Sequence, residues 1–205
     1  MTKHHRHGWL FLRKWLKEPM KIAAPWPSSK YLADAMCVPI NGNSHGAVVE
    51  LGGGTGAVTH ALLDRCFDKQ DLYIIEKDET LAAMLATKYP EATIIEGDAG
   101  DMDRLLKERG VARVSAVVSS LPMLLIPERT QFEILKKSFA MLEKDGIFVQ
   151  YTYGLRSPID RTILRRLGIT GHAGQAIWRN LPPARVWSFR QAESVVAPRD
   201  AHALS

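Results

Sequence analysis

A short glycine-rich stretch constrains this chain more than any other feature. Residues 50–56 read Glu-Leu-Gly-Gly-Gly-Thr-Gly and follow directly on an apolar run at 47–49. Glycines at alternate positions let the backbone turn sharply and approach a ligand or the next helix closely, because they carry no Cβ. A strand, a glycine loop and a helix in this order predict the first unit of a Rossmann-type sheet.

The acid that precedes the glycines separates two kinds of ligand. Gly52, Gly54 and Ala57 also satisfy the G-x-G-x-x-[G/A] spacing of NAD-binding loops. A carboxylate at Glu50 would repel a pyrophosphate, whereas it would attract the amino group of a cationic sulfonium. The loop therefore favours S-adenosylmethionine (SAM) over NAD, with S-adenosylhomocysteine as product. A glycine turn that binds nothing is the alternative to both.

Two further acids close the next predicted strands. Glu76 ends the strand at 72–76, about 20 residues beyond the glycines, where a carboxylate can accept both ribose hydroxyls. Asp98 follows the strand at 92–96 and can accept from the adenine amino group. Either acid alone is a common surface feature, but the ordered set favours SAM strongly. The predicted cofactor residues are Glu50, Gly52, Gly53, Gly54, Gly56, Glu76, Lys77, Asp98, Ala99, Ser119 and Leu121.

Apolar strands alternate with helical patterns along the middle of the chain, which predicts parallel βαβ units. We expect strands at 47–50, 72–76, 92–96, 114–119 and 147–151, helices at 57–67, 79–89, 102–109 and 129–142, and a closing hairpin at 176–178 and 185–189. The predicted fold is α/β: a Rossmann-like class I SAM-dependent methyltransferase with a mostly parallel seven-stranded sheet and helices on both faces.

Positive charge is concentrated at the N-terminus. Residues 1–30 hold seven lysines or arginines and one glutamate, a net charge of +6, whereas the whole chain carries +5. The remainder is therefore close to neutral, which argues against a broad nucleic-acid groove across the domain. We expect a basic arm at 1–30, a methyltransferase domain at 31–190 and a flexible tail at 191–205.

The arm also has an amphipathic pattern. On a helical wheel, two tryptophans and several leucines lie opposite a face of lysine and arginine, which predicts an N-terminal amphipathic helix in an anionic membrane interface. Packing of the apolar face on the domain itself is the alternative. The predicted membrane residues are Trp9, Leu12, Arg13, Lys14, Trp15, Leu16 and Lys17.

Other composition signals indicate the compartment. No apolar run reaches the roughly 18 residues of a transmembrane helix, and Arg13 and Lys14 interrupt the N-terminal apolar run too early for a signal peptide. Cys37 and Cys66 are isolated, which favours a reducing compartment. We expect a cytoplasmic protein held peripherally at the inner face of the membrane. The histidines at positions 4, 5 and 7 give no convincing metal site.

The loop after the fourth predicted strand bears on the substrate. Amino methyltransferases often carry [N/D]-[P/L]-P-[Y/F] there, and this chain has Ser-Ser-Leu-Pro-Met at 119–123. The Leu-Pro core is kept, but the leading amide or acid and the aromatic residue are absent. This departure weakens an adenine substrate, which needs a stacked and hydrogen-bonded planar base. A loop merely bent by proline is the alternative.

Several stretches share a pattern with one family and together span nearly the whole chain. They lie at 11–19, 27–33, 50–56, 119–122, 150–154, 157–158 and 179–187. In these stretches the chain resembles bacterial phospholipid N-methyltransferases that act on phosphatidylethanolamine. The resemblance implies phospholipid biosynthesis, with stepwise SAM-dependent methylation of the ethanolamine head group towards phosphatidylcholine.

Three tyrosines are the predicted catalytic residues. Tyr151 and Tyr153 end the fifth strand on one side, where they can orient an amine and face a methylated cation. Tyr31 lies where the arm joins the domain. Core or rim packing is the alternative for all three. The predicted substrate-binding residues are Pro122, Arg179, Asn180 and Arg185, because arginine matches phosphate geometry; a solvated strand edge is the equal alternative.

Two rival functions stay open from the sequence. An rRNA adenine N6-dimethyltransferase-like enzyme would share the fold, the loop and a Leu-Pro motif, and the pI of about 9.3 suits RNA. A membrane protein that binds SAM or lipid without turnover would keep the same cofactor residues.

Overall fold

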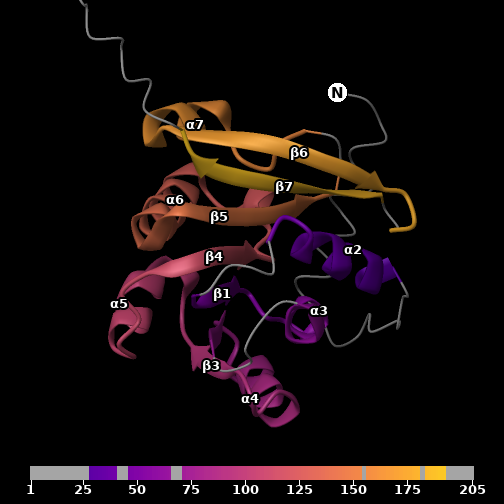
Figure 1. Ribbon diagram of the computed structural model, residues 1–205, viewed down its shortest axis with the longest axis vertical. Coiled ribbons are helices and arrows are strands. Elements are labelled where there is room, and N and C mark those ends of the chain that lie inside the picture. The colour runs from indigo at the N-terminus through magenta and orange to yellow at the C-terminus, as the bar shows by residue number, and fades with distance from the viewer. Residues whose placement is uncertain (1–27, 41–45, 66–70, 154–155, 181–182, 193–205) are drawn as a thin grey trace, which may run out of the picture.

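A seven-stranded sheet in the order β3-β2-β1-β4-β5-β7-β6 forms the centre of the molecule (Figure 1). The computed structural model describes residues 28–40, 46–65, 71–153, 156–180 and 183–192. The predicted N-terminal amphipathic helix, with all the predicted membrane residues, lies outside these ranges, as do residues 193–205 of the predicted tail.

Six of the strands run in the same direction, and β7 runs in the opposite direction. The pairings among β1 to β5 are all parallel, whereas β7 lies between β5 and β6 and pairs antiparallel with both. The predicted α/β class with a mostly parallel seven-stranded sheet is therefore confirmed. The strands are β1 (Val48–Leu51), β2 (Leu72–Glu76), β3 (Thr93–Glu96), β4 (Val114–Ser119), β5 (Leu142–Thr152), β6 (Ile169–Ile177) and β7 (Ala184–Gln191).

The strand order fixes where a ligand site can form. From β1 the chain proceeds outward through β2 to β3 on one side, and then returns to β4 on the other side of β1. This reversal is a topological switch point, and ligands of such sheets bind beyond the carboxyl ends of the strands there. The glycine loop leaves β1 at this point.

Helices cover both faces of the sheet, as predicted (Figure 1). The core on one face includes α2 (Ser28–Cys37), α3 (Ala57–Arg65) and Leu85 of α4 (Glu79–Lys88). The opposite face is covered by three other helices. These are α5 (Met102–Lys107), α6 (Glu128–Met141) and α7 (Arg161–Leu167), and two 3-10 turns, η2 (Ala99–Asp101) and η3 (Met123–Leu125), follow β3 and β4.

Two helices were not expected from the sequence. α2 begins within the segment predicted as the arm, directly after proline at position 27. α7 is only seven residues long; Asp160 caps its start by accepting from Thr162 N, and Gly168 ends it with a φ of 63°. An isolated helix this short has little intrinsic stability, so packing of Ile163 against the core is what maintains it.

Two strands extend well beyond their predicted bounds. β5 begins at Leu142, because that residue pairs with Val114 across a register shift. β6 begins at Ile169 although most of its residues are glycine or polar and exposed. As the edge strand it pairs with β7 on one side only, so its sequence lacks the apolar alternation that marks an internal strand.

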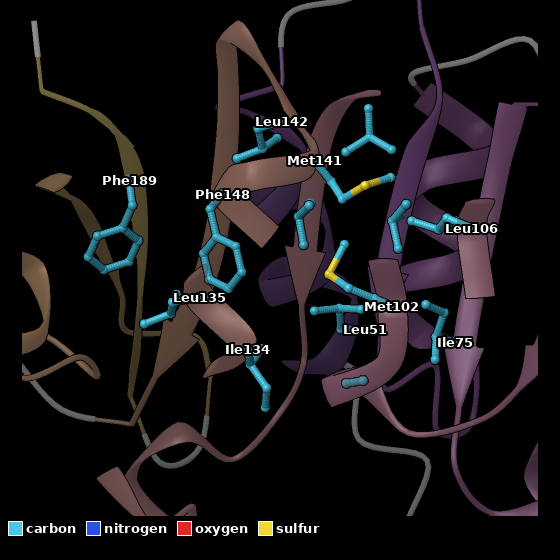
Figure 2. Packing of buried hydrophobic residues seen from close by; sticks show 14 of the residues in the cluster. Leu51, Ile75, Met102, Leu106, Ile134, Leu135, Met141, Leu142, Phe148 and Phe189 are labelled. Carbon is cyan, nitrogen blue, oxygen red and sulfur yellow. The ribbon is translucent and has the colours of Figure 1, made fainter. Parts of the chain in front are cut away.

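The larger core lies between the sheet and α5, α6 and α7 (Figure 2). Phe148 of β5 and Phe189 of β7 meet edge to face, with ring centroids 6.2 Å apart, and Leu135 of α6 packs beside them. Burying each such side chain contributes about 1.5–3 kcal/mol. This packing holds β4, β5 and β7 in fixed positions, and the predicted substrate residues Pro122 and Arg185 follow β4 and lie near the start of β7.

Candidate active site

The glycine loop has the backbone conformation that the sequence predicts. Gly52, Gly54 and Gly56 all have positive φ values, 77°, 54° and 82°, which side chains of L-residues rarely tolerate. A Cβ at Gly54 would meet no atom of the described chain within 4 Å. Gly54 therefore faces the open side of the loop, where a ligand can approach the backbone.

The other loop glycines face the protein. A Cβ at Gly53 would lie 2.6 Å from Ile74 Cγ2 and 2.8 Å from Leu85 Cδ1, and one at Gly56 would lie 2.5 Å from Tyr89 Cε2. Tyr89 also donates from its hydroxyl to the Gly56 carbonyl at 2.8 Å. Gly53 and Gly56 are therefore needed for packing against β2 and α4, which separates their role from that of Gly54.

Glu50 is the one completely buried carboxylate among the described residues. Thr59 Oγ1 donates to its Oε2 at 2.6 Å, while Oε1 is buried without a hydrogen-bond partner in the described chain. Burial raises the pKa of Glu50 to about 8; the Thr59 hydrogen bond opposes this shift and the charge of Glu76 adds to it. An unpaired acceptor at this place fits the cationic amino group of SAM.

Glu76 ties the end of β2 to the glycine loop. Its Oε2 accepts from Gly54 N at 2.8 Å and its Oε1 accepts from Asp78 N at 2.9 Å. Each carboxylate oxygen keeps further acceptor capacity, because an ionised carboxyl offers about four lone-pair sites. The arrangement fits a ligand whose ribose hydroxyls donate to Glu76 beside the open face of Gly54.

Asp98 and Lys77 form an ion pair at the ends of β3 and β2. Lys77 Nζ lies 2.9 Å from Asp98 Oδ2, and Gly100 N donates to Asp98 Oδ1 at 2.8 Å. The Lys77 hydrogen bond, followed by the Gly100 bond, lowers the pKa of Asp98, so the carboxylate stays ionised. Ala99, which opens η2, is buried behind this pair.

The Leu-Pro loop after β4 touches the glycine loop. A Cβ at Gly52 would lie 3.1 Å from Leu121 Cδ2. Buried Ser119 ends β4, and its hydroxyl accepts from Leu121 N at 3.4 Å. Gln150 Nε2 donates to Leu121 O at 3.0 Å, while Pro122 opens η3. The two loops therefore adjoin at the switch point, which places the predicted cofactor and substrate residues side by side.

The tyrosine pair lies at the carboxyl end of β5, as predicted. The rings of Tyr151 and Tyr153 meet edge to face with centroids 5.5 Å apart. Burial is the largest cause that raises the pKa of both phenols, and hydrogen bonds from Tyr151 and Asn180 partly oppose it at Tyr153. Both phenols are neutral at physiological pH, so they can donate and accept hydrogen bonds but are not bases.

Tyr31 and Arg179 meet over the same end of the sheet. The Arg179 guanidinium carbon lies 5.4 Å from the centroid of the Tyr31 ring, a cation–π contact between α2 and the turn that follows β6. Buried Asn180 reaches Tyr153 from this turn. The structure thus brings Tyr31, Tyr153, Arg179 and Asn180 into one cluster.

Arg185 does not point to that cluster. It is opposite Thr152 in β7, and alternation places it on the same face as Trp187, whereas Ala184 and Val186 share the core of Tyr151. Its Nε is buried without a partner in the described chain. Arg185 therefore lies beside the end of β5 but on the opposite face from the tyrosine pair.

Two residues of the site were missed by the sequence reasoning. Thr59 lies in the first turn of α3, which brings its hydroxyl back under the loop to Glu50. Gln150 precedes Tyr151 and joins the Leu-Pro loop to β5 through two carbonyls, Leu121 O and Tyr151 O. In the sequence, the only indication of a role for Thr59 or Gln150 was that a polar residue stands within an otherwise apolar element.

Features of other kinds of site are not found in the described ranges. None of the helices there is both long and apolar enough to cross a membrane. No three His, Cys, Asp or Glu side chains within those ranges cluster as metal ligands. Two shallow hollows, both lined by Arg113, lie at the start of β4 and therefore at the opposite end of the parallel strands from the site.

Curated proteins give one match over most of the chain and another over a quarter of it. The chain is 32% identical over 146 residues to the ornithine lipid N-methyltransferase of Singulisphaera acidiphila, a match that covers 70% of this chain and 76% of that protein. It is 47% identical over 51 residues to the ribosomal RNA small subunit methyltransferase A of Chlorobium chlorochromatii, which covers 25% of this chain and 18% of that protein. No protein-family model matches the chain.

Solved structures agree on the fold. The 1,6-didemethyltoxoflavin-N1-methyltransferase of Burkholderia thailandensis, solved with S-adenosylhomocysteine, has a TM-score of 0.64 at 16% identity, covering 94% of this chain and 92% of that one. The magnesium protoporphyrin IX methyltransferase of Synechocystis, solved with SAM, has a TM-score of 0.59 at 13% identity, covering 80% of each chain. With the relative from Singulisphaera, these findings show that the chain belongs to the SAM-dependent lipid N-methyltransferase family.

Proposed function

We propose that the protein transfers the methyl group of SAM to the amine of a membrane-lipid head group, with phosphatidylethanolamine as substrate and stepwise addition towards phosphatidylcholine. The observation that carries this proposal is the cluster of Tyr31, Tyr153 and Arg179 beside the Leu-Pro loop. Aromatic rings suit an alkylammonium, and a guanidinium suits the anion attached to it. The family relative acts on ornithine lipid, by its name.

The cofactor half would hold SAM through three groups. Glu50 Oε1 would accept from the amino group, Glu76 would accept from the ribose hydroxyls, and the open face of Gly54 would lie against the ligand. Asp98 and Ala99 would border the adenine. When bound, SAM supplies a methyl carbon that the amine lone pair attacks, while the electrons of the broken C–S bond stay on sulfur.

The reacting amine must first lose a proton. A lipid alkylammonium has a pKa close to that of lysine, about 10.4, so most of it is protonated at neutral pH. Tyr151 and Tyr153 are half-buried, and a partly desolvated site of this kind disfavours the charged form of the amine. The proton leaves to water, since the neutral phenols are not bases. An N–H of the amine then donates to the Tyr153 oxygen in place of Tyr151 or Asn180, which aims the lone pair.

The anion beside the amine would be recognised by Arg179. A guanidinium pairs with a phosphate or a carboxylate by two parallel hydrogen bonds. Phosphatidylethanolamine carries a phosphate and ornithine a carboxylate, so Arg179 suits both. The distance between the anion and the amine differs between the two head groups, and this distance would determine which lipid the site prefers. A direct comparison of the two lipids as substrates tests this preference.

The N-terminal arm would hold the enzyme on the inner face of the membrane. Its support is the sequence pattern of Trp9 and Trp15 opposite basic residues. Replacing both tryptophans with alanine is expected to reduce binding to anionic vesicles while SAM binding survives. Unchanged vesicle binding would show that the arm has another role.

Methylation of rRNA adenine is the second candidate. The partial match to the ribosomal RNA methyltransferase favours it. Met123 stands where that chemistry needs an aromatic residue to stack on the base, and residues 31–205 are close to neutral. These two features favour the lipid amine.

One experiment separates the candidates. Radiolabelled SAM is offered with vesicles of phosphatidylethanolamine, with vesicles of ornithine lipid and with structured RNA, and the labelled product is identified. Label in phosphatidylethanolamine is expected; label in ornithine lipid alone would correct the head group, and label in RNA would replace the proposal. SAM binding without labelling of any acceptor would indicate a protein that binds but does not turn over.

A further inference from the structure

Large apolar side chains are exposed at one edge of the described structure. Trp178 is 72% exposed, Leu124 52% and Tyr31 44%. Leu124 and Trp178 follow the carboxyl ends of β4 and β6, and Tyr31 of α2 contacts Arg179 beside Trp178. A fourth, Val38, is also 72% exposed but lies at the other end of α2 from Tyr31.

Trp178 occupies the turn between β6 and β7. Ile177, the last residue of β6, is opposite Ala184, the first residue of β7. The next residue of β7 is opposite Thr152, which ends β5. The turn is therefore adjacent to the end of β5, close to α2 (Figure 1), and Arg179 in the turn contacts Tyr31 of α2.

Leu124 lies on the other side of the tyrosine pair. It is in η3, directly after the Leu-Pro loop at the end of β4. The order β4-β5-β7-β6 places three strand spacings of about 4.8 Å each between β4 and β6, so the two strands that Leu124 and Trp178 follow are on the order of 14 Å apart. Tyr153 lies between them, at the end of β5.

Charges and chain connection favour a lipid surface as the partner. Three exposed cations lie along this edge: Lys30 beside Tyr31, Arg156 after the end of β5, and Arg179 beside Trp178. Two acids lie there as well, since α2 carries Asp34 and Glu128 follows Leu124 at the start of α6. Tryptophan prefers the boundary between water and lipid, and cations bind anionic head groups. The basic amphipathic sequence at 9–20 also precedes Ser28 by only a few residues, and Ser28 begins α2 about one helical turn before Tyr31.

We propose that Trp178 and Leu124 form a membrane-contact rim, which inserts into the head-group layer on both sides of the active-site opening. The rim rests on the proposed function only for the identity of the lipid that enters between them. Its consequence is that the folded domain, and not the N-terminal arm alone, orients the tyrosine pair towards the bilayer. Leu124 and Trp178 fill no core, so the fold leaves them free for this contact.

The test measures membrane binding without catalysis. The full chain and its variants are sedimented with vesicles of equal parts phosphatidylglycerol and phosphatidylcholine, which carry no primary amine to methylate. Trp178→Ala is expected to weaken binding about tenfold, the effect of withdrawing one large apolar side chain from lipid. Leu124→Ala is expected to weaken it in the same direction, and Trp178→Phe to restore most of the binding. Val38→Ala, equally exposed, is the matched control and is expected to have no effect.

The outcomes are distinct. Unchanged vesicle binding in Trp178→Ala, or an equal loss in Val38→Ala, would overturn the rim. So would a variant that loses affinity for structured RNA and keeps its affinity for vesicles. The same measurement in the Trp9→Ala/Trp15→Ala background separates the rim from the arm. If the rim contacts the membrane itself, Trp178→Ala must weaken vesicle binding further in that background. A rim that binds these vesicles while no lipid amine is methylated would refute the proposed function and leave the rim standing.

Discussion

The hydroxyl of Thr59 donates to Glu50 Oε2 at 2.6 Å, whereas Glu50 Oε1 has no hydrogen-bond partner within the described chain. The Thr59 bond fixes one oxygen and leaves the other directed at no protein donor. Burial keeps the pKa of the carboxyl at about 8, so near neutral pH most of the ligand-free protein holds a proton there. A cation that bound at Oε1 would displace that proton.

Affinity for SAM should therefore depend on pH through Glu50. A bound cation lowers the pKa of Glu50, so SAM binding releases a proton at pH values below about 8, and affinity rises as pH increases towards that value. Titration calorimetry in buffers of different ionisation enthalpy measures the released proton. Glu50→Gln is expected to bind SAM weakly and to release none. Equal proton release in this variant would place the titrating group elsewhere.

The same carboxyl should limit the stability of the ligand-free protein. Folding raises the pKa of Glu50 from 4.5 to about 8. The contribution of this carboxyl to the free energy of unfolding is therefore fully present below pH 4.5 and is lost as pH rises to about 8. Glu50→Gln removes the titration and keeps an acceptor for Thr59. The variant should melt at a higher temperature than the natural protein, and the difference should grow from about pH 5 to about pH 8. The corresponding gain in the free energy of unfolding is at most about 4 kcal/mol. A constant difference across this range would contradict the buried ionisation.

Sequence patterns predicted the parallel part of the fold well, because its strands are apolar and its turns carry glycine or proline. The bounds of β2 and β4 were predicted correctly to the residue. β6 was mostly missed, since an exposed edge strand is determined by hydrogen bonding to β7 and not by its own side chains. The short helix α7 depends on tertiary packing in the same way.

The site was predicted in its parts but not in its assembly. Spacing located Glu50 and Glu76, because strand ends and loops leave a linear signal. Nothing linear indicated that Thr59 reaches Glu50, or that Arg179 stacks on Tyr31 from a distant turn. Alternation along β7 would have separated Arg185 from the tyrosine pair, but only once the strand register was known.

A matched pair of glycine variants tests the roles within the loop. Gly54→Ala and Gly56→Ala impose similar backbone strain, since both residues have positive φ. Only the Cβ at position 56 meets the Tyr89 ring, whereas the one at 54 enters open space. Gly54→Ala should stay folded and lose SAM affinity, while Gly56→Ala should unfold at a clearly lower temperature. Thermal unfolding and SAM titration measure the two effects, and full SAM affinity in Gly54→Ala would remove that backbone from the site.

Tyr153→Phe tests the hydroxyl that we assign to the amine. The ring and its contact with Tyr151 are retained, so the rate of methyl transfer to lipid is expected to fall about 10²-fold or less while SAM affinity holds. Tyr73→Phe is the control, because Tyr73 lies on β2 and packs against the opposite core. Full activity of Tyr153→Phe would limit this residue to packing.

Arg179→Ala tests recognition of the head-group anion. Loss of the guanidinium removes the partner of the phosphate and the contact with Tyr31, so KM for the lipid should rise about tenfold while the dissociation constant of SAM is unchanged. Arg166→Ala is the matched control: Arg166 also stacks on a ring, that of Phe132, at 4.3 Å, but on the other face of the sheet. Kinetics with phosphatidylethanolamine and with ornithine lipid in mixed micelles measure both variants. A fall in kcat without a change in KM would mean that Arg179 positions the tyrosines, and an equal effect of Arg166→Ala would refute a local role altogether.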